Sequence, residues 1–121
     1  MKRKFIICFD LDNVICTTIG KNYLKAKPKK KIINLINRLY EDNYEIRIFT
    51  ARYMGRNKDS IIKAKKQGFK LTFNQLKKWK VKYHKLMMGK PSYDLFIDDK
   101  AFGFKKDWYL SLKSKIKEII D

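Results

Sequence analysis

The stretch Lys4-Phe-Ile-Ile-Cys-Phe-Asp-Leu-Asp12 decides the fold class of this chain. From Lys4 to Phe9 it is a run of β-branched and aromatic residues without helical periodicity, which predicts a buried strand. The run stops at Asp10, and a second carboxylate follows at Asp12. Ligands of open parallel sheets bind at the carboxyl ends of the strands. The stretch therefore predicts a strand that carries two acidic side chains to a ligand site.

Helices and strands alternate along the rest of the chain. Apolar residues at three- and four-residue spacing predict the long helices, and the Thr72-x-x-Gln75 spacing of a capping box predicts a short one. The predicted elements are a helix after Pro28, a strand over 44–50, a helix over 57–67 closed by Gly68, a helix over 72–79, strands over 81–86 and 93–97, and a helix over 108–120. This order predicts one α/β domain over residues 1–121 with a mainly parallel sheet.

Composition narrows the class of protein. Apolar residues make up 45% of the 121 residues, and Gly and Pro together are only seven, which excludes a disordered or collagen-like chain. Every apolar run is far shorter than the roughly 20 residues that span a bilayer. The two cysteines form no disulfide framework. We therefore expect a cytoplasmic protein with no membrane partner.

The charge is strongly basic, with 30 Lys and Arg against 12 Asp and Glu and a net charge of +18. Such a balance favours a nucleic-acid partner. However, 25 of these bases are Lys and only 5 are Arg, whereas Arg suits planar recognition of phosphates and base edges. A solvated, Lys-rich surface is the alternative interpretation. In either case the field attracts anions, including a phosphorylated substrate.

Four acidic residues follow two of the predicted strands directly: Asp10 and Asp12 after the first, and Asp98 and Asp99 after the strand over 93–97. If the chain reverses direction across the sheet, these two strands are neighbours and the four carboxylates converge. Carboxylates so close repel one another unless a cation neutralises them. Oxygen ligands without His or Cys favour Mg²⁺ over zinc.

Four motifs in this order resemble those of the haloacid dehalogenase (HAD) superfamily. They are Phe9-Asp-Leu-Asp-Asn-Val14, Ile46-Arg-Ile-Phe-Thr-Ala-Arg52, Gly89-Lys-Pro91 and Leu95-Phe-Ile-Asp-Asp99. The stretch over 72–101 is also similar to small HAD proteins associated with bacterial capsule and lipopolysaccharide synthesis. The resemblance implies a three-layer, Rossmann-like HAD core. Because the segments over 14–27 and 51–89 are short, we expect no cap domain.

The resemblance also implies a role for each motif residue. Asp10 would be the nucleophile that forms an aspartyl phosphate, and Asp12 the general acid and then base. Mg²⁺ would be held by Asp10, by the backbone carbonyl of Asp12, by Asp98, and by Asp99 directly or through water. Thr50 and Lys90 would bind the phosphoryl group, with Lys100 as the alternative to Lys90. Arg52, two residues after Thr50, would either support another residue of the site or contact a substrate phosphate, and a simple position at the surface is the alternative.

These residues predict a Mg²⁺-dependent phosphatase acting on a phosphate monoester. The resemblance favours a small phosphorylated sugar, polyol or amino-alcohol of capsule biosynthesis as substrate. A nucleic-acid end-processing phosphatase or a nucleic-acid-binding module is the alternative that the net charge keeps open. A phosphorylation-receiver domain has its acidic pair early in the chain, whereas the pair here comes last. Without a cap, the site would take a large substrate, or a small one enclosed by a second subunit of a homo-oligomer.

Overall fold

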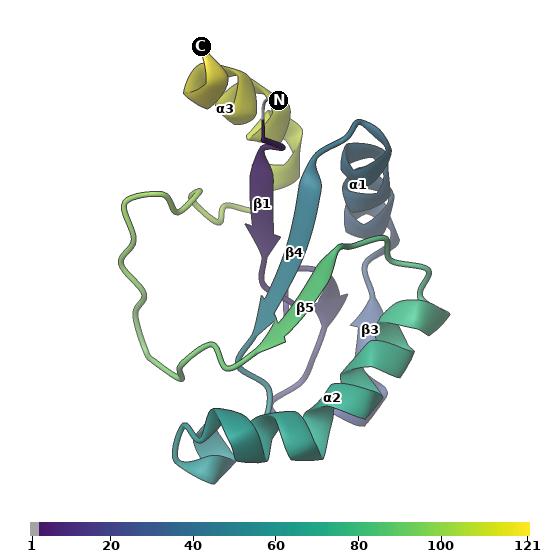
Figure 1. Cartoon of the computed structure of the whole chain (residues 1–121), viewed down its shortest axis with the longest axis vertical. Helices are drawn as coiled ribbons and strands as arrows, with labels where there is room; N and C mark the ends of the chain where they lie inside the picture. Colours follow the sequence, from purple (N-terminus) through teal and green to yellow (C-terminus); the bar gives the residue numbers. More distant parts are fainter. Residues whose placement is uncertain (1–2) are drawn as a thin grey trace.

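Three parallel strands form the central sheet in the computed structural model, which describes residues 3–121 (Figure 1). They are β1 (Ile6–Phe9), β4 (Glu45–Thr50) and β5 (Lys85–Met88), in the order β1-β4-β5. Ile7 pairs with Ile46, and Thr50 pairs with Met88. The register brings the carboxyl ends of all three strands to the same edge. The predicted α/β fold with a parallel sheet is confirmed.

Three helices accompany the sheet: α1 (Lys30–Glu41), α2 (Ile61–Lys78) and α3 (Trp108–Ile120). The buried residues of β1 and β4 belong to one hydrophobic core with those of α1 and α3, and the Phe9 and Trp108 rings lie 6.3 Å apart. Along β1 and β4 every second residue is buried. Successive side chains of a strand point to opposite faces, so one face of each strand packs into this core. Helix α2 lies beside β5 and extends past the carboxyl ends of the strands (Figure 1).

Between β1 and α1 the chain forms a small flap. Its parts are the antiparallel strands β2 (Cys16–Thr17) and β3 (Lys27–Pro28) with the 3-10 helix η1 (Tyr23–Lys25) between them. A second 3-10 helix, η2 (Gly55–Asn57), follows β4. The flap and η2 both lie close in sequence to the strand ends, so they frame the candidate site.

Helix α2 runs unbroken where two helices were predicted. Gly68 does not close a helix: it lies within α2, and a Cβ at this position would come within 2.2 Å of the Tyr53 ring. Glycine costs a helix roughly 1 kcal/mol relative to alanine, and here it lets Tyr53 pack against the helix. The capping box at Thr72 and Gln75 was also a wrong interpretation, since both residues lie inside α2.

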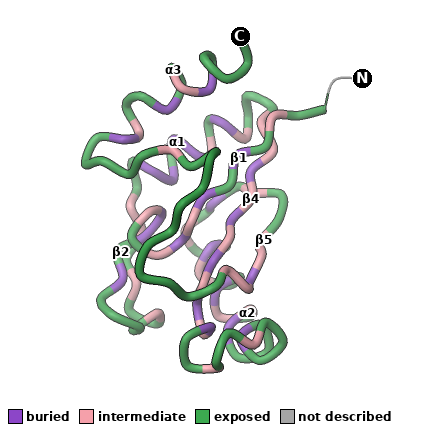
Figure 2. Tube along the Cα trace, turned by 90° about the vertical axis from the view of Figure 1, so that its left-hand side faces the viewer, coloured by how far each residue is buried: buried purple, intermediate pink, exposed green. Residues whose placement is uncertain are grey.

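The strand predicted over 93–97 is absent, and this prediction was wrong. Residues 91–101 form an exposed loop without strand pairing (Figure 2). The apolar side chains expected inside the sheet are exposed, with Leu95 at 78% and Ile97 at 88%. The Tyr93 and Phe96 rings instead pair with each other, 5.0 Å apart. Their contact is with each other rather than with the sheet. The outer edge of β1 therefore has no neighbouring strand among the described residues.

None of the helices in residues 3–121 is both long and apolar enough to cross a bilayer.

Candidate active site

Asp10 lies directly after β1 and forms an ion pair with Lys90. Its Oδ2 lies 3.3 Å from the Lys90 Nζ, while its Oδ1 accepts a hydrogen bond from the Leu11 N–H at 2.8 Å. The backbone N–H of Lys90 donates to the Thr50 carbonyl at 3.1 Å, which ties the end of β5 to the end of β4. The structure therefore brings Asp10, Thr50 and Lys90 together. Lys100, the alternative to Lys90, is exposed in the loop over 91–101.

Two aromatic rings cover the Lys90 ammonium. Its Nζ lies 5.4 Å from the ring centroids of Tyr93 and Phe96, within the range of cation–π attraction. Burial lowers the pKa of Lys90, but the contacts with Tyr93 and with the Asp10 carboxylate outweigh this and hold the pKa above its ordinary value. Lys90 is thus a fully charged group beside Asp10 at neutral pH.

Asp12 is held from two sides. The Thr18 hydroxyl donates to Asp12 Oδ1 at 2.6 Å, and Arg52 donates from Nη2 to Oδ1 at 2.9 Å and from Nε to Oδ2 at 3.0 Å. A left-handed residue, Asn13 at φ 65°, turns the chain here, and its side chain accepts a hydrogen bond from the Thr18 N–H. Asparagine tolerates this conformation better than most residues. The turn thereby brings Thr18 back to Asp12.

Arg52 is a buried residue, and neighbouring side chains hold its charged group. Its side chain has 0% relative exposure. Besides Asp12, its guanidinium contacts Thr72 Oγ1 at 3.4 Å and Gln75 Oε1, and it lies 4.9 Å from the Tyr23 ring centroid. The surface position considered for Arg52 is therefore wrong, whereas the expected support of another site residue fits its contacts with Asp12. A contact of Arg52 with a substrate phosphate stays a prediction. Burial of a charge requires a partner, and Asp12 is that partner.

Thr50 ends β4 and is fully buried, as the strand alternation places it. Its hydroxyl accepts a hydrogen bond from the Arg52 N–H at 3.1 Å. Thr50 thus joins the Asp10–Lys90 pair, through its carbonyl, to the Asp12–Arg52 pair, through its hydroxyl. This link gives the four residues one fixed frame.

Sequence reasoning missed the residues that support Arg52. Thr72 and Gln75 lie one turn apart on α2, so their side chains share a helix face. Gln75 accepts from Arg52 and donates to the Tyr23 carbonyl of η1 at 2.6 Å. The Thr-x-x-Gln spacing was a real signal of two polar groups on one face. What distinguishes this role from helix capping is their position inside α2 and their contact with the buried Arg52.

Asp98 and Asp99 lie apart from the other site residues. Both are exposed in the loop over 91–101, where the Asp98 carboxylate accepts a hydrogen bond from the Lys100 N–H at 2.9 Å. This backbone hydrogen bond, with a side-chain hydrogen bond from Asp99, holds the pKa of Asp98 below its usual value. Within residues 3–121 no three His, Cys, Asp or Glu side chains are grouped as metal ligands. The structure therefore does not bring the four carboxylates together, and their joint binding of Mg²⁺ stays a prediction.

The remaining carboxylates still suit a hard cation. Mg²⁺ is commonly bound through one or two carboxylates, with water and substrate phosphate completing its ligands. Asp10 offers such a carboxylate at the end of β1, and its oxygens are hard ligands of the kind that Mg²⁺ prefers. The Asp12 carboxylate is held by Arg52 and Thr18, and the resemblance assigns the metal contact of this residue to its backbone carbonyl instead.

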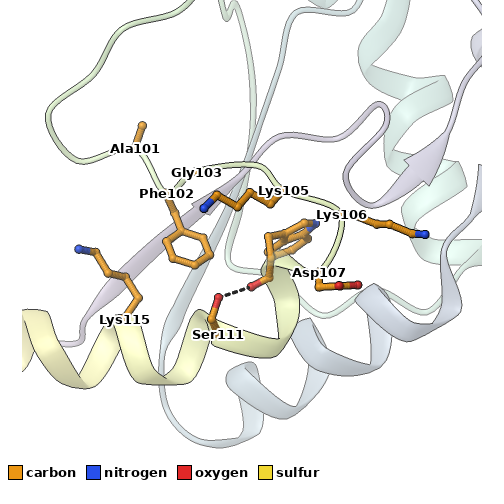
Figure 3. A pocket seen from close by; sticks show the side chains of 9 residues that line it. Ala101, Phe102, Gly103, Lys105, Lys106, Asp107, Ser111 and Lys115 are labelled. Carbon is orange, nitrogen blue, oxygen red and sulfur yellow. Dashed lines mark hydrogen bonds between the residues drawn. The ribbon is translucent and has the colours of Figure 1, made fainter.

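Two hollows lie away from Asp10, around the start of α3. One, of about 590 Å³, is lined by the residues that Figure 3 draws; among them Ser111 Oγ donates to the Trp108 carbonyl at 3.3 Å. The second, of about 490 Å³, is lined by Lys29, Lys30, Lys31, Ile32, Phe104, Lys105, Lys106, Trp108 and Tyr109. Lysines make up five of the nine lining residues of the second hollow and three of the nine of the first, where Asp107 and Ser111 also lie. The second hollow therefore favours anions.

The fold has a counterpart among solved structures. A crystal structure of an MCSG target from Vibrio cholerae superposes with a TM-score of 0.83 and 22% sequence identity, covering 95% of each chain. At this identity the likeness concerns the fold alone. No protein-family model matches the chain, and no curated protein matches it either.

Proposed function

We propose that this chain hydrolyses phosphate monoesters, with Asp10 as the nucleophile. The observation that supports it is the Asp10–Lys90 pair at the carboxyl ends of β1 and β5, fixed to Thr50. A carboxylate beside a cation and a strand-end threonine is suited to attack on a phosphoryl group, since the cation offsets the charge that develops in the transition state. The resemblance of the four motifs to the HAD superfamily supports the same chemistry.

The reaction has two steps. An Asp10 carboxylate oxygen attacks phosphorus, the bond from phosphorus to the ester oxygen breaks, and the leaving alkoxide takes a proton from Asp12. Water then attacks the aspartyl phosphate and gives its proton to Asp12. The bond between phosphorus and Asp10 breaks, which releases inorganic phosphate and restores both side chains. Lys90 stays charged throughout and offsets the phosphoryl charge beside Asp10.

Mg²⁺ belongs to this proposal as a cofactor held by Asp10. When bound, it would act as a Lewis acid on the phosphoryl oxygens. Asp98 and Asp99 lie in the exposed loop, so this proposal assigns the cation to Asp10 first.

The substrate that the resemblance favours is a small phosphorylated sugar, polyol or amino-alcohol of capsule biosynthesis. A second candidate, an end-phosphorylated nucleic acid, is favoured by the net charge of +18 and by the hollow lined with Lys29, Lys30, Lys31, Lys105 and Lys106. A homo-oligomer that encloses a small substrate remains a prediction. Cytoplasmic location is likewise an expectation from the sequence.

The test is phosphate release from p-nitrophenyl phosphate with and without Mg²⁺, followed by a panel of small phosphates and end-phosphorylated oligonucleotides. Asp10→Asn removes the nucleophile and is expected to abolish turnover. Asp94→Asn is the matched control, because Asp94 lies exposed in the loop over 91–101. Turnover that survives Asp10→Asn, or no turnover of any panel member by the wild type, would contradict the proposal. The panel separates the two substrate classes.

A further inference from the structure

The most completely satisfied charged group in the described chain is the Arg52 guanidinium. Its Nε and Nη2 hold Asp12, its Nη1 contacts Gln75 and Thr72, and its face lies against the Tyr23 ring. An arginine fork of this kind fixes its partner in position and orientation, which a lysine point charge does not.

The partners of Arg52 come from three separate parts of the chain. Asp12 follows β1, Tyr23 belongs to η1 of the flap, and Gln75 belongs to α2. Gln75 also donates to the Tyr23 carbonyl at 2.6 Å, so the flap and α2 are connected to each other as well as to Arg52. Such a closed network has little freedom to rearrange when a substrate binds.

The two oxygens of Asp12 are not equivalent in this network. Oδ1 accepts from Thr18 Oγ1 at 2.6 Å, from Arg52 Nη2 at 2.9 Å and from Arg52 Nε at 3.2 Å. Oδ2 accepts from Arg52 Nε at 3.0 Å. A carboxylate oxygen accepts about two hydrogen bonds well. Oδ1 is therefore saturated, and Oδ2 is the oxygen left to exchange a proton with a substrate.

We propose that Arg52 is a positioning residue for the proposed phosphatase reaction: it directs Asp12 Oδ2 toward the leaving group, and Gln75 holds Arg52 in place. This inference rests on the proposed function, in which Asp12 protonates the leaving group. Arg52 touches no substrate in this role. It acts only through Asp12.

Leaving-group dependence tests this inference. A proton from Asp12 matters for an alkyl phosphate, whose alkoxide is a poor leaving group, and matters little for 2,4-dinitrophenyl phosphate. General acid catalysis contributes about 10²- to 10⁴-fold. We expect Arg52→Lys to lower kcat/KM by about 100-fold for glycerol phosphate and by less than about tenfold for 2,4-dinitrophenyl phosphate. Asp12→Asn should produce the same selectivity with a larger loss.

A second variant guards against misfolding of Arg52→Lys. Gln75→Leu removes one support of Arg52 without touching Asp12, and we expect the same selectivity with a smaller loss. Gln67→Leu on the same helix is the matched control, because Gln67 is exposed and its side chain bonds only to Asn57. It should leave both rates unchanged.

The outcomes separate the inference from the proposed function. Equal losses for both substrates in Arg52→Lys and Gln75→Leu would mean a merely structural role, and a faster reaction of the alkyl phosphate would mean that Arg52 opposes the proton transfer. Either result overturns the inference while the phosphatase remains. If the Asp10→Asn variant turns over both substrates as fast as the wild type does, the proposed function itself fails.

Discussion

Two regions of the chain carry an apolar run followed by two aspartates: β1 with the turn after it (the corner around Asp12), and the loop over 91–101. They differ in burial and in the partners of their charged groups. At the corner, Asp12 and Arg52 have partners for their charged groups, and Arg52 is fully buried. In the loop, every residue from 91 to 101 is exposed, including Leu95 and Ile97. The difference teaches that an acidic pair after an apolar run becomes a site only where a buried counter-charge and neighbouring strands receive it.

The largest difference between the two regions is expected in stability. Leu11, between the two aspartates, is fully buried, whereas Leu95 is 78% exposed. Leu11→Ala is expected to lower the free energy of unfolding by about 2–5 kcal/mol, because it removes apolar contacts and leaves a cavity. Leu95→Ala is expected to change it by less than about 0.5 kcal/mol. Urea denaturation of both variants measures this.

A comparable loss from Leu95→Ala would break the comparison. It would mean that the loop over 91–101 is packed in solution, against the exposed edge of β1 or against another chain. Because both changes are Leu to Ala, the side-chain chemistry is the same and only the surroundings differ.

The next difference is expected in activity. Thr50→Val removes the hydroxyl that is expected to contact the phosphoryl group and that accepts a hydrogen bond from the Arg52 N–H. We expect kcat/KM for p-nitrophenyl phosphate to fall by about 10²- to 10³-fold, the usual effect of losing one hydrogen-bonding group to a transition state. Thr50→Ser keeps the hydroxyl and should recover most of the rate.

Asp98→Asn should change kcat/KM and the Mg²⁺ dependence by less than about threefold, because Asp98 lies in the loop.

A strong Mg²⁺ phenotype of Asp98→Asn would contradict the separation of the two regions. It would show that the loop brings its carboxylates to Asp10 during the reaction. Titration of activity against Mg²⁺ concentration, in the variant and the wild type, decides between these results.

The sequence predicted the regular parts of this fold well because local patterns determine them. The period-2 pattern of Glu45–Thr50 and the amphipathic pattern of Trp108–Ile120 both occur where they were expected. The sequence failed at residues 93–97, since an apolar run becomes a strand only when an edge pairs with it. For Arg52 it left several roles open, because the same Thr-Ala-Arg motif fits an exposed or a buried side chain. The side chain is buried here because Thr72 and Gln75 on α2 lie where they can accept hydrogen bonds from Arg52.

The pH dependence of the Asp10–Lys90 pair is a smaller effect. Despite the lowering effect of burial, the pKa of Lys90 is raised by Tyr93 and Asp10, so its charged form is favoured in the folded chain. Its contribution to stability is therefore fully present below the ordinary lysine pKa of about 10.4 and is lost as pH rises through the higher folded value. Because both side chains keep some solvent contact, we expect about 0.5 kcal/mol.

Lys90→Met isolates this contribution. The difference in unfolding free energy between Lys90→Met and the wild type should be constant from pH 7 to about pH 10 and shrink above it. Lys100→Met is the control from the loop over 91–101, where no ion pair of Lys100 exists among the described residues. A difference that grows with pH would have the wrong sign for a lysine with a raised pKa.

The smallest effect is expected from the two thiols, which lie on either side of Asp10. Cys16 is buried at the corner, whereas Cys8 is exposed on β1. Burial raises the pKa of both thiols, so both react slowly through their thiolates. Even so, only Cys8 can meet a reagent in the folded chain. We expect one thiol to be modified by a disulfide reagent at pH 8 under native conditions and the second only in denaturant, with Cys8→Ser removing the first. Lys90 lowers the pKa of Cys8 and also contacts Phe96 of the loop. If Cys8 failed to react with the reagent under native conditions, the loop would have to close over β1. The two regions would then be less separate than their exposure indicates.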